Sequence, residues 1–128
     1  MNRRALVVED SPVIQQLIEI CLRPAGFAVD FAGAGTDALA AASAAPPDLV
    51  VLDVGLPDMS GWEVLEQLRD RPETRHVVIL MLTGDGREET EQRADALGAD
   101  AFLTKPFRPS DLREVCSKLV SGKFPTVV

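Results

Sequence analysis

Five short, mostly apolar runs alternate along the chain with five segments whose apolar residues recur at helical spacing. This alternation constrains the fold more than any other feature. The runs are rich in Val, Leu and Ile, which is typical of strands buried on both faces of a parallel sheet. They lie at residues 5–8, 27–31, 49–52, 77–82 and 101–103. Because right-handed crossovers place helices on both faces, the pattern predicts a single doubly wound α/β sheet with five parallel strands.

Several residues indicate where the helices begin and end. Ser11, followed by a proline, is the expected N-cap of the first helix, and Gly26 follows its end. Thr36 is the expected cap of an Ala-rich helix, Gly98 is the expected stop of the fourth helix, and Ser110 is the expected cap of the last. The fourth helix, at about 87–97, is highly charged and offers little apolar surface to a core. We therefore expect it to be the least firmly held.

Length and charge limit the classes of function. A chain of 128 residues is the size of one domain, and its composition, 46% hydrophobic and 26% charged, is that of an ordinary globular protein. A net charge of −7 has the wrong sign for direct binding of nucleic acid or of an anionic membrane surface. No apolar run is long enough to span a membrane and no signal-peptide pattern is present, so the expected location is the cytoplasm.

The two cysteines, Cys21 and Cys116, lie far apart in the sequence and have no Cys or His neighbours at metal-ligand spacing. Neither a zinc site nor a disulfide framework is indicated. We expect both to be small apolar side chains in the core faces of helices.

Polar residues follow four of the predicted strands at their carboxyl ends, where open α/β sheets place their sites. Glu9 and Asp10 follow the first strand, Asp53 the third, Thr83 the fourth and Lys105 the fifth. Clustered carboxylates repel one another unless a cation is present, and an all-oxygen set of ligands suits Mg²⁺. One carboxylate could then attack a phosphoryl group while the ammonium and hydroxyl groups stabilise its oxygens.

These residues, together with Asp53-x-x-x-Pro57, the later Gly61, Thr83-Gly84 and Lys105-Pro106, resemble the receiver domain of two-component response regulators of the chemotaxis-regulator type. The resemblance runs from about Arg4 to Val120. It implies a flavodoxin-like strand order of 2-1-3-4-5. It also implies that residues 1–128 form a single receiver domain, with a core at about 4–120 and a short tail at 121–128.

The resemblance assigns a metal site. Asp10 is the implied direct ligand of Mg²⁺ or Mn²⁺, and Glu9 is implied to act through a water molecule. Asp53 and the backbone carbonyl of Gly55 complete the implied protein contacts.

The resemblance also assigns the phosphoryl chemistry. Asp53 is the implied phosphoacceptor, and the donor is a sensor histidine kinase or a phosphotransfer protein. Thr83 is implied to bind a phosphoryl oxygen, Lys105 to pair with the phosphoryl group, and the bond before Pro106 to be cis. Such a protein is not a conventional turnover enzyme, although it assists its own phosphorylation and dephosphorylation.

Phe102 occupies the position of the aromatic switch of that family. Movement of Thr83 toward the phosphoryl group would leave a space into which Phe102 turns. The surface of the fourth helix, fifth strand and fifth helix would then change for a downstream protein or an attached output domain.

Two other residues have simpler expected roles. Trp62 is expected to pack in the core. His76, in the turn before the fourth strand, is expected to have no role in metal binding or phosphorelay.

Two other functions are compatible with part of the pattern. An aspartyl-phosphate hydrolase of the haloacid-dehalogenase type would need Asp-x-Asp, but Asp53 is followed by Val54 and Gly55. A flavodoxin-like FMN module would need a phosphate cradle after the first strand, where Glu9 and Asp10 would repel phosphate.

A monomer is the expected oligomeric state. Similar receivers that are joined to winged-helix DNA-binding domains dimerise through salt bridges across the face just described. Ala101 stands here where that subgroup has an Asp, and Val115 stands where it has an Arg. A different network remains possible through three arginines, Arg87, Arg93 and Arg113.

Overall fold

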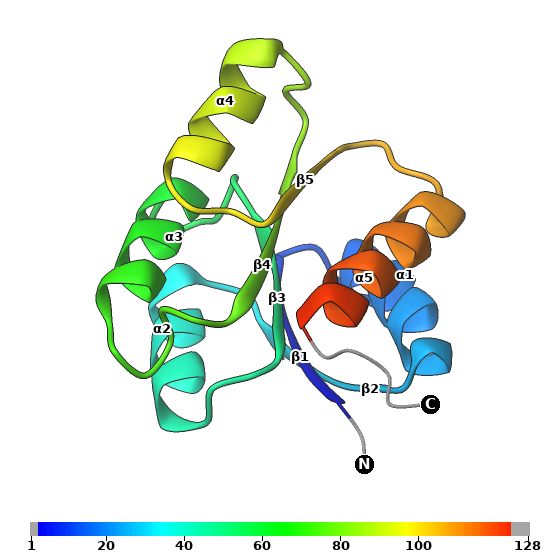
Figure 1. Ribbon diagram of the computed structural model, residues 1–128, viewed down its shortest axis with the longest axis horizontal. Coiled ribbons are helices and arrows are strands. Elements are labelled where there is room, and N and C mark those ends of the chain that lie inside the picture. The colour runs from blue at the N-terminus through cyan, green and yellow to red at the C-terminus, as the bar shows by residue number, and fades with distance from the viewer. Residues whose placement is uncertain (1–2, 124–128) are drawn as a thin grey trace.

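Five parallel strands form one sheet in the order β2-β1-β3-β4-β5, which confirms the predicted fold class and strand order (Figure 1). The structure is a computed structural model that describes residues 3–123. The strands are β1 (Arg3–Val8), β2 (Phe27–Ala32), β3 (Leu49–Asp53), β4 (Val78–Thr83) and β5 (Ala101–Thr104). The helices are α1 (Pro12–Leu22), α2 (Gly35–Ala44), α3 (Gly61–Asp70), α4 (Glu88–Ala96) and α5 (Pro109–Lys123), and a short 3-10 helix, η1 (Arg23–Ala25), follows α1.

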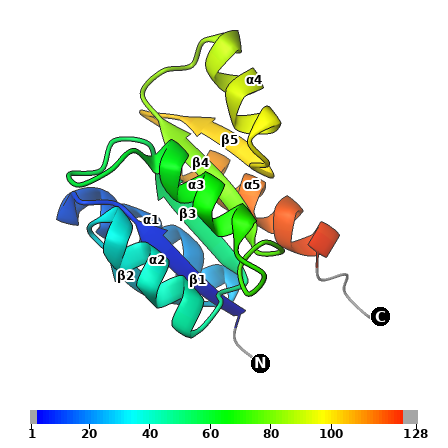
Figure 2. The ribbon, with the colours of Figure 1, turned by 90° about the vertical axis from the view of Figure 1, so that its left-hand side faces the viewer.

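Helices cover both faces of the sheet. Figures 1 and 2 show α1 and α5 against one face and α2, α3 and α4 on the other side. Successive side chains of a strand point to opposite faces, so Ala5 and Val7 pack with α1 and α5 while Leu6 and Val8 pack beneath α2 and α3. This division explains why β3 and β4 are buried along their whole length instead of alternating with exposed polar residues, whereas the edge strand β2 carries the exposed Asp30.

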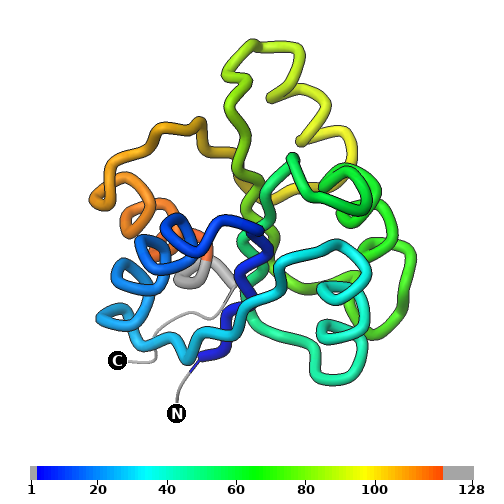
Figure 3. Tube along the Cα trace, turned by 180° about the vertical axis from the view of Figure 1, so that it is seen from behind, coloured from blue at the N-terminus to red at the C-terminus, as the bar shows by residue number. Residues whose placement is uncertain are grey.

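The register of the sheet brings the carboxyl ends of its strands to one edge. Val8 of β1 pairs with Leu52 of β3, so Glu9 and Asp53 are the next residues along two adjacent strands. Thr83 of β4 pairs with Thr104 of β5, and Lys105 follows directly. The backbone trace in Figure 3, seen from behind, shows α1 and α5 on one side of the central strands and α2, α3 and α4 on the other.

Three predicted helix boundaries are confirmed, among them Gly26, which follows α1 and η1 with a positive φ of 93°, and two are wrong. The Ser11 hydroxyl accepts from the Ile14 N–H at the start of α1, and Gly98 has the positive φ, 95°, of a helix stop. Thr36 is not the N-cap, because α2 begins one residue earlier, at Gly35. The side chain that accepts from the first N–H groups of α2 belongs to a distant loop, as described below. Ser110 is not a cap either. Helix α5 begins one residue earlier at Pro109, whose fixed φ suits a first turn.

Helix α5 continues through Lys123, three residues past the end of the core expected from the sequence. The rest of the expected tail, 124–128, lies outside the described residues. No helix in the described part of the chain combines the length and the apolar character needed to cross a membrane.

The predicted roles of the cysteines and of α4 agree with the packing. Cys21 and Cys116 are buried free thiols on α1 and α5, and burial raises the pKa of Cys116 to about 12. In α4 only Ala94 is buried, so this helix contributes little to the core.

Candidate active site at the carboxyl edge of the sheet

Three carboxylates meet at the carboxyl edge, as the sequence predicts. Glu9, Asp10 and Asp53 each place an oxygen within 4.8 Å of the other two. Glu9 and Asp53 are buried, at 2% and 5% exposure, whereas Asp10 is exposed. The cluster is therefore open to solvent on the side of Asp10.

Lys105 supplies the positive charge of the site. Its Nζ lies 2.8 Å from Asp53 Oδ1 and 3.0 Å from Glu9 Oε2. Its backbone N–H donates to the Thr83 carbonyl at 2.7 Å, so the lysine is fixed to the end of β4 as well as to both acids. The following bond, Lys105–Pro106, is cis, as expected.

The balance of charge favours a further cation. Burial raises the pKa of Glu9, the neighbouring Asp53 raises it further, and hydrogen bonds from Lys105 and the Ser11 N–H only partly oppose this, so the pKa stays above its ordinary value. Burial lowers the pKa of Lys105, but hydrogen bonds to Asp53 and Glu9 and the charges of both acids raise it overall. One ammonium thus faces three carboxylates, and the donor set, oxygen throughout, fits Mg²⁺.

The loop between β3 and α3, residues 54–60, closes tightly over Asp53. The Val54 N–H donates to Leu82 O at 3.0 Å, the Gly61 N–H donates to Val54 O at 2.8 Å, and Gly55 and Ser60 form an antiparallel bridge. A Cβ added at Gly55 would lie 3.8 Å from Asp53 Oδ2, so this residue adjoins the carboxylate. The Gly55 carbonyl, which is the expected metal contact, belongs to this part of the loop.

Gly61 has a steric reason for its place in the motif. A Cβ at this position would overlap the carbonyl oxygen of Asp53 and the Cα of Val54. Both atoms are backbone and cannot move aside cheaply. Only glycine therefore allows α3 to start this close to the end of β3.

Thr83 is buried at the end of β4, and its Oγ accepts a hydrogen bond from the Asp85 N–H at 3.0 Å. Asp85 in turn accepts from Arg87 and from the Thr90 hydroxyl at the start of α4. The hydrogen bonds from Arg87 hold the pKa of Asp85 well below its usual range. A chain of hydrogen bonds thus joins Thr83 to α4.

Sequence reasoning missed two acids near the site, Asp85 and Asp58. Asp85 follows a glycine and Asp58 follows a proline, and both lie in turns shortly before a helix. Short acidic side chains in turns commonly accept hydrogen bonds from backbone N–H groups. That pattern could have identified Asp85, whose partners are local. It could not have identified the partners of Asp58, which lie in α2.

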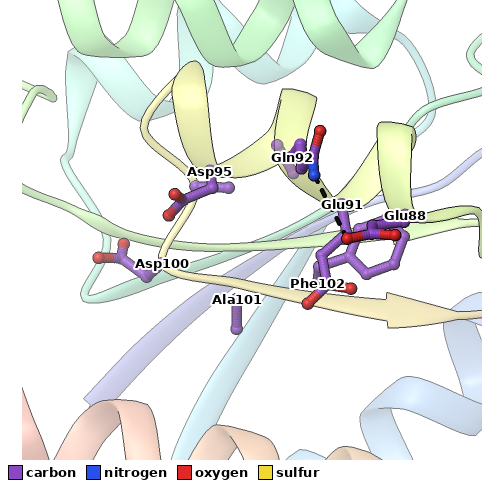
Figure 4. A pocket seen from close by; sticks show the side chains of 9 residues that line it. Glu88, Glu91, Gln92, Asp95, Asp100, Ala101 and Phe102 are labelled. Atoms are coloured by element: carbon purple, nitrogen blue, oxygen red, sulfur yellow. Dashed lines mark hydrogen bonds between the residues drawn. The ribbon is translucent and has the colours of Figure 1, made fainter.

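Phe102 lies half-buried on β5 and packs against the core beneath α4. It also lines a groove of about 380 Å³ between α4 and β5 (Figure 4). The other lining residues are mostly acidic or small: Glu88, Glu91, Gln92, Ala94, Asp95, Ala99, Asp100 and Ala101.

Trp62 packs in the core at 7% exposure, which confirms its expected role. The guanidinium carbon of Arg93 lies 4.6 Å from the centre of its ring, within cation–π range, and this contact joins α4 to α3. His76 is exposed in the turn before β4, as the sequence indicates.

The family model of the response regulator receiver domain matches residues 5–117. The phosphate regulon transcriptional regulatory protein PhoB of Rhizobium meliloti is 41% identical over 128 residues, which are all of this chain and 56% of that protein. The chain spans about half the length of the curated relatives it matches.

Solved structures show the same similarity. Chemotaxis response regulator CheY4 of Vibrio cholerae matches with a TM-score of 0.87 and 34% identity, over 93% of this chain and 99% of that one. The receiver domain of sensor histidine kinase PA1611 of Pseudomonas aeruginosa matches with a TM-score of 0.85 and 27% identity, over 94% and 99% of the two chains. That structure has a magnesium ion coordinated in its active site cleft.

Proposed function

The chain belongs to the receiver-domain family of response regulators, and on that premise we propose that Asp53 is the residue that accepts its phosphoryl group. Phosphorylation on an aspartate in two-component signalling is the function of this family, and response regulators interact with histidine kinases. The observation that carries the assignment is the contact of Lys105 Nζ with Asp53 Oδ1 at 2.8 Å inside the carboxylate cluster.

Phosphoryl transfer requires Asp53 to act as a nucleophile. One of its carboxylate oxygens attacks the phosphorus of a phosphohistidine, a P–O bond forms, and the P–N bond breaks with its electron pair returning to the imidazole. Lys105 stabilises the negative charge on the phosphoryl oxygens from its present position beside Asp53. The Thr83 hydroxyl, which accepts from the Asp85 N–H in this structure, donates to another phosphoryl oxygen.

Receiver domains bind Mg²⁺ at an acidic pocket, and Glu9, Asp10 and Asp53 form such a cluster here. The finer assignment is a proposal: Asp10 and Asp53 bind the ion directly, Glu9 acts through water, and the Gly55 carbonyl completes the protein contacts. Bound Mg²⁺ would neutralise the acids and so permit an anionic donor to approach. The same residues assist loss of the phosphoryl group to water, so the protein is a signalling device that assists its own chemistry.

The switch follows from the connections of Thr83. Its movement toward a phosphoryl group would break the bond from Asp85 N–H and release the turn that precedes α4. Phe102 lies beneath α4 and turns inward as the contact changes. The α4–β5–α5 face then differs between the two states, and a downstream protein or an attached output domain responds to it.

We expect the chain to act as a monomer at that face. Ala101 and Val115 offer no charges for an isologous interface. Two of the arginines that could have built another network have partners within the chain, since Arg87 pairs with Asp85 and Arg93 stacks on Trp62.

Phosphorylation with acetyl phosphate and Mg²⁺ tests the function. Phos-tag gels should show one shifted band for the parent protein and none for Asp53→Asn or in excess EDTA. Label on Asp53→Asn, or label without metal, would contradict the assignment. Turnover of phosphomonoesters would favour the hydrolase, and a yellow purified protein would favour the flavin module, but the family match supports neither.

A further inference from the structure

Asp58 connects the loop over the active site to a helix that is far away in sequence. Its Oδ1 accepts from the Gly35 N–H at 2.7 Å, and its Oδ2 accepts from the Thr36 N–H at 3.0 Å and from the Thr36 hydroxyl at 2.8 Å. The backbone hydrogen bonds from Thr36 and Gly35 lower the pKa of Asp58 to about 2. The side chain is therefore a carboxylate at all ordinary pH values.

A steric contact accompanies these hydrogen bonds. A Cβ added at Gly35 would overlap the side chain of Met59, the residue next to Asp58. The start of α2 and the tip of the 54–60 loop are thus in direct contact. The backbone hydrogen bonds of this loop lie at its two ends, through Val54 and Gly61, while Leu56 and Met59 pack against the core.

Helix α2 has no cap of its own. Ala34 occupies the N-cap position with the extended backbone typical of that position, φ −146° and ψ 155°, but its side chain cannot accept a hydrogen bond. A local Ser, Asp or Asn at this position would satisfy the helix. The chain instead takes the acceptor from a loop that borders the carboxylate cluster.

We propose that Asp58 is a positioning residue for the metal site, which it serves by fastening the tip of the 54–60 loop to the start of α2 and so holding the Gly55 carbonyl in place. The inference rests on the proposed function, because it assumes that this carbonyl contacts the ion. A loop released from α2 would populate the binding-competent arrangement for only a fraction of the time. The apparent affinity for Mg²⁺ falls in proportion to that fraction, and we expect a decrease of about tenfold.

A pair of variants separates positioning from simple helix capping. Asp58→Ala removes both the cap and the attachment of the loop. Ala34→Asp combined with Asp58→Ala supplies a local cap to α2, leaves the loop tip without its hydrogen bonds to α2 and keeps the net charge of the chain. Asp58→Asn, which retains one carbonyl acceptor, is the milder variant should Asp58→Ala fold poorly.

Two quantities are measured for each variant: the Mg²⁺ affinity, by calorimetry, and the rate of amide hydrogen exchange in the metal-free protein. The Ala38 N–H donates to Ala34 O in the first turn of α2, and the Gly61 N–H donates to Val54 O at the base of the loop, so the two amides report on the two elements separately. In Asp58→Ala both amides should exchange faster and Mg²⁺ should bind about tenfold more weakly. In the double variant Ala38 should recover while Gly61 and the affinity do not, and Asp58→Asn should lie between parent and Asp58→Ala.

Full recovery of Mg²⁺ affinity in the double variant would show that Asp58 is only a helix cap and would overturn the proposal. Unchanged affinity and unchanged Gly61 exchange in Asp58→Ala would overturn it too. Failure of the parent protein to bind Mg²⁺ would instead count against the proposed function, and the exchange of Gly61 in the metal-free variants would still decide whether Asp58 holds the loop.

Discussion

Replacing Lys105 with Met should destabilise the metal-free protein, because two buried carboxylates would lose the cation between them. Two unit charges within 4.8 Å of each other repel by at least about 3.5 kcal/mol at an effective dielectric constant of about 20. Glu9 could escape this repulsion by binding a proton. From its ordinary pKa of 4.5, protonation costs about 3.4 kcal/mol at about pH 7.

The charge repulsion and the cost of protonating Glu9 are similar, so both set about the same upper limit on the loss of stability. Part of the cost of burying Glu9 is already present in the parent protein, because the pKa of Glu9 is raised there as well. We therefore expect Lys105→Met to lower the free energy of unfolding by about 2 to 3 kcal/mol near neutral pH, at or just below the low end of the range for a broken buried ion pair.

The loss should depend on pH in a defined direction. The pKa of Glu9 in the folded state lies above 4.5, so the stability linked to its proton is fully present below 4.5 and is lost as pH rises through the folded value. Removing Lys105 raises that folded value further, which moves the loss to higher pH. On acidification from about pH 7 to about pH 5, the variant should regain more stability than the parent.

Urea unfolding with and without millimolar Mg²⁺, at both pH values, measures these effects. Mg²⁺ should restore part of the loss, because it binds only the folded state. Lys118→Met is the matched control. Lys118 is an exposed lysine paired with Glu114 on α5, and its loss should change stability by less than about 0.5 kcal/mol. A loss in Lys105→Met that is no larger than in the control, or one that responds neither to acid nor to Mg²⁺, would refute the electrostatic account.

Three further outcomes are expected. Gly61→Ala should lower the free energy of unfolding by about 2 to 3 kcal/mol in urea, because its Cβ would overlap the backbone of Asp53 and Val54; parent-like stability would contradict the steric argument. Thr83→Ala should weaken the response of α4 and β5 amide shifts to beryllofluoride, since the hydrogen-bonded route through Asp85 begins at the Thr83 hydroxyl, and a full parent response would remove Thr83 from the switch. Light scattering at tens of micromolar protein with beryllofluoride and Mg²⁺ should give the monomer mass, and a stable dimer through the α4–β5–α5 face would show this expectation to be wrong.

Local sequence determined the strands and the position of the carboxylate cluster. A strand buried on both faces has to be apolar throughout, as residues 49–52 are, and in a parallel sheet the residue that follows, Asp53, must lie at the edge where the other strands end. Glu9, Thr83 and Lys105 were predictable for the same reason, because each directly follows or ends a strand of that sheet.

Local sequence also determined the caps whose partners are near in the chain. Ser11 accepts from Ile14, three residues away, and Gly98 needs no partner to adopt its positive φ. Thr36 shows where this reasoning stops. It has the right residue type next to a helix start, but the acceptor for that helix is Asp58, 22 residues farther on.

Only the tertiary structure decided the contacts that join separate elements around the site. The stacking of Arg93 on Trp62 and the attachment of the 54–60 loop to α2 depend on the distance between helices on the same face of the sheet. That distance is set by core packing across the strands, and no spacing in the sequence records it. The residue types along one strand or helix follow from its own burial pattern, whereas a hydrogen bond between two elements exists only when the packing of the whole sheet brings donor and acceptor within reach.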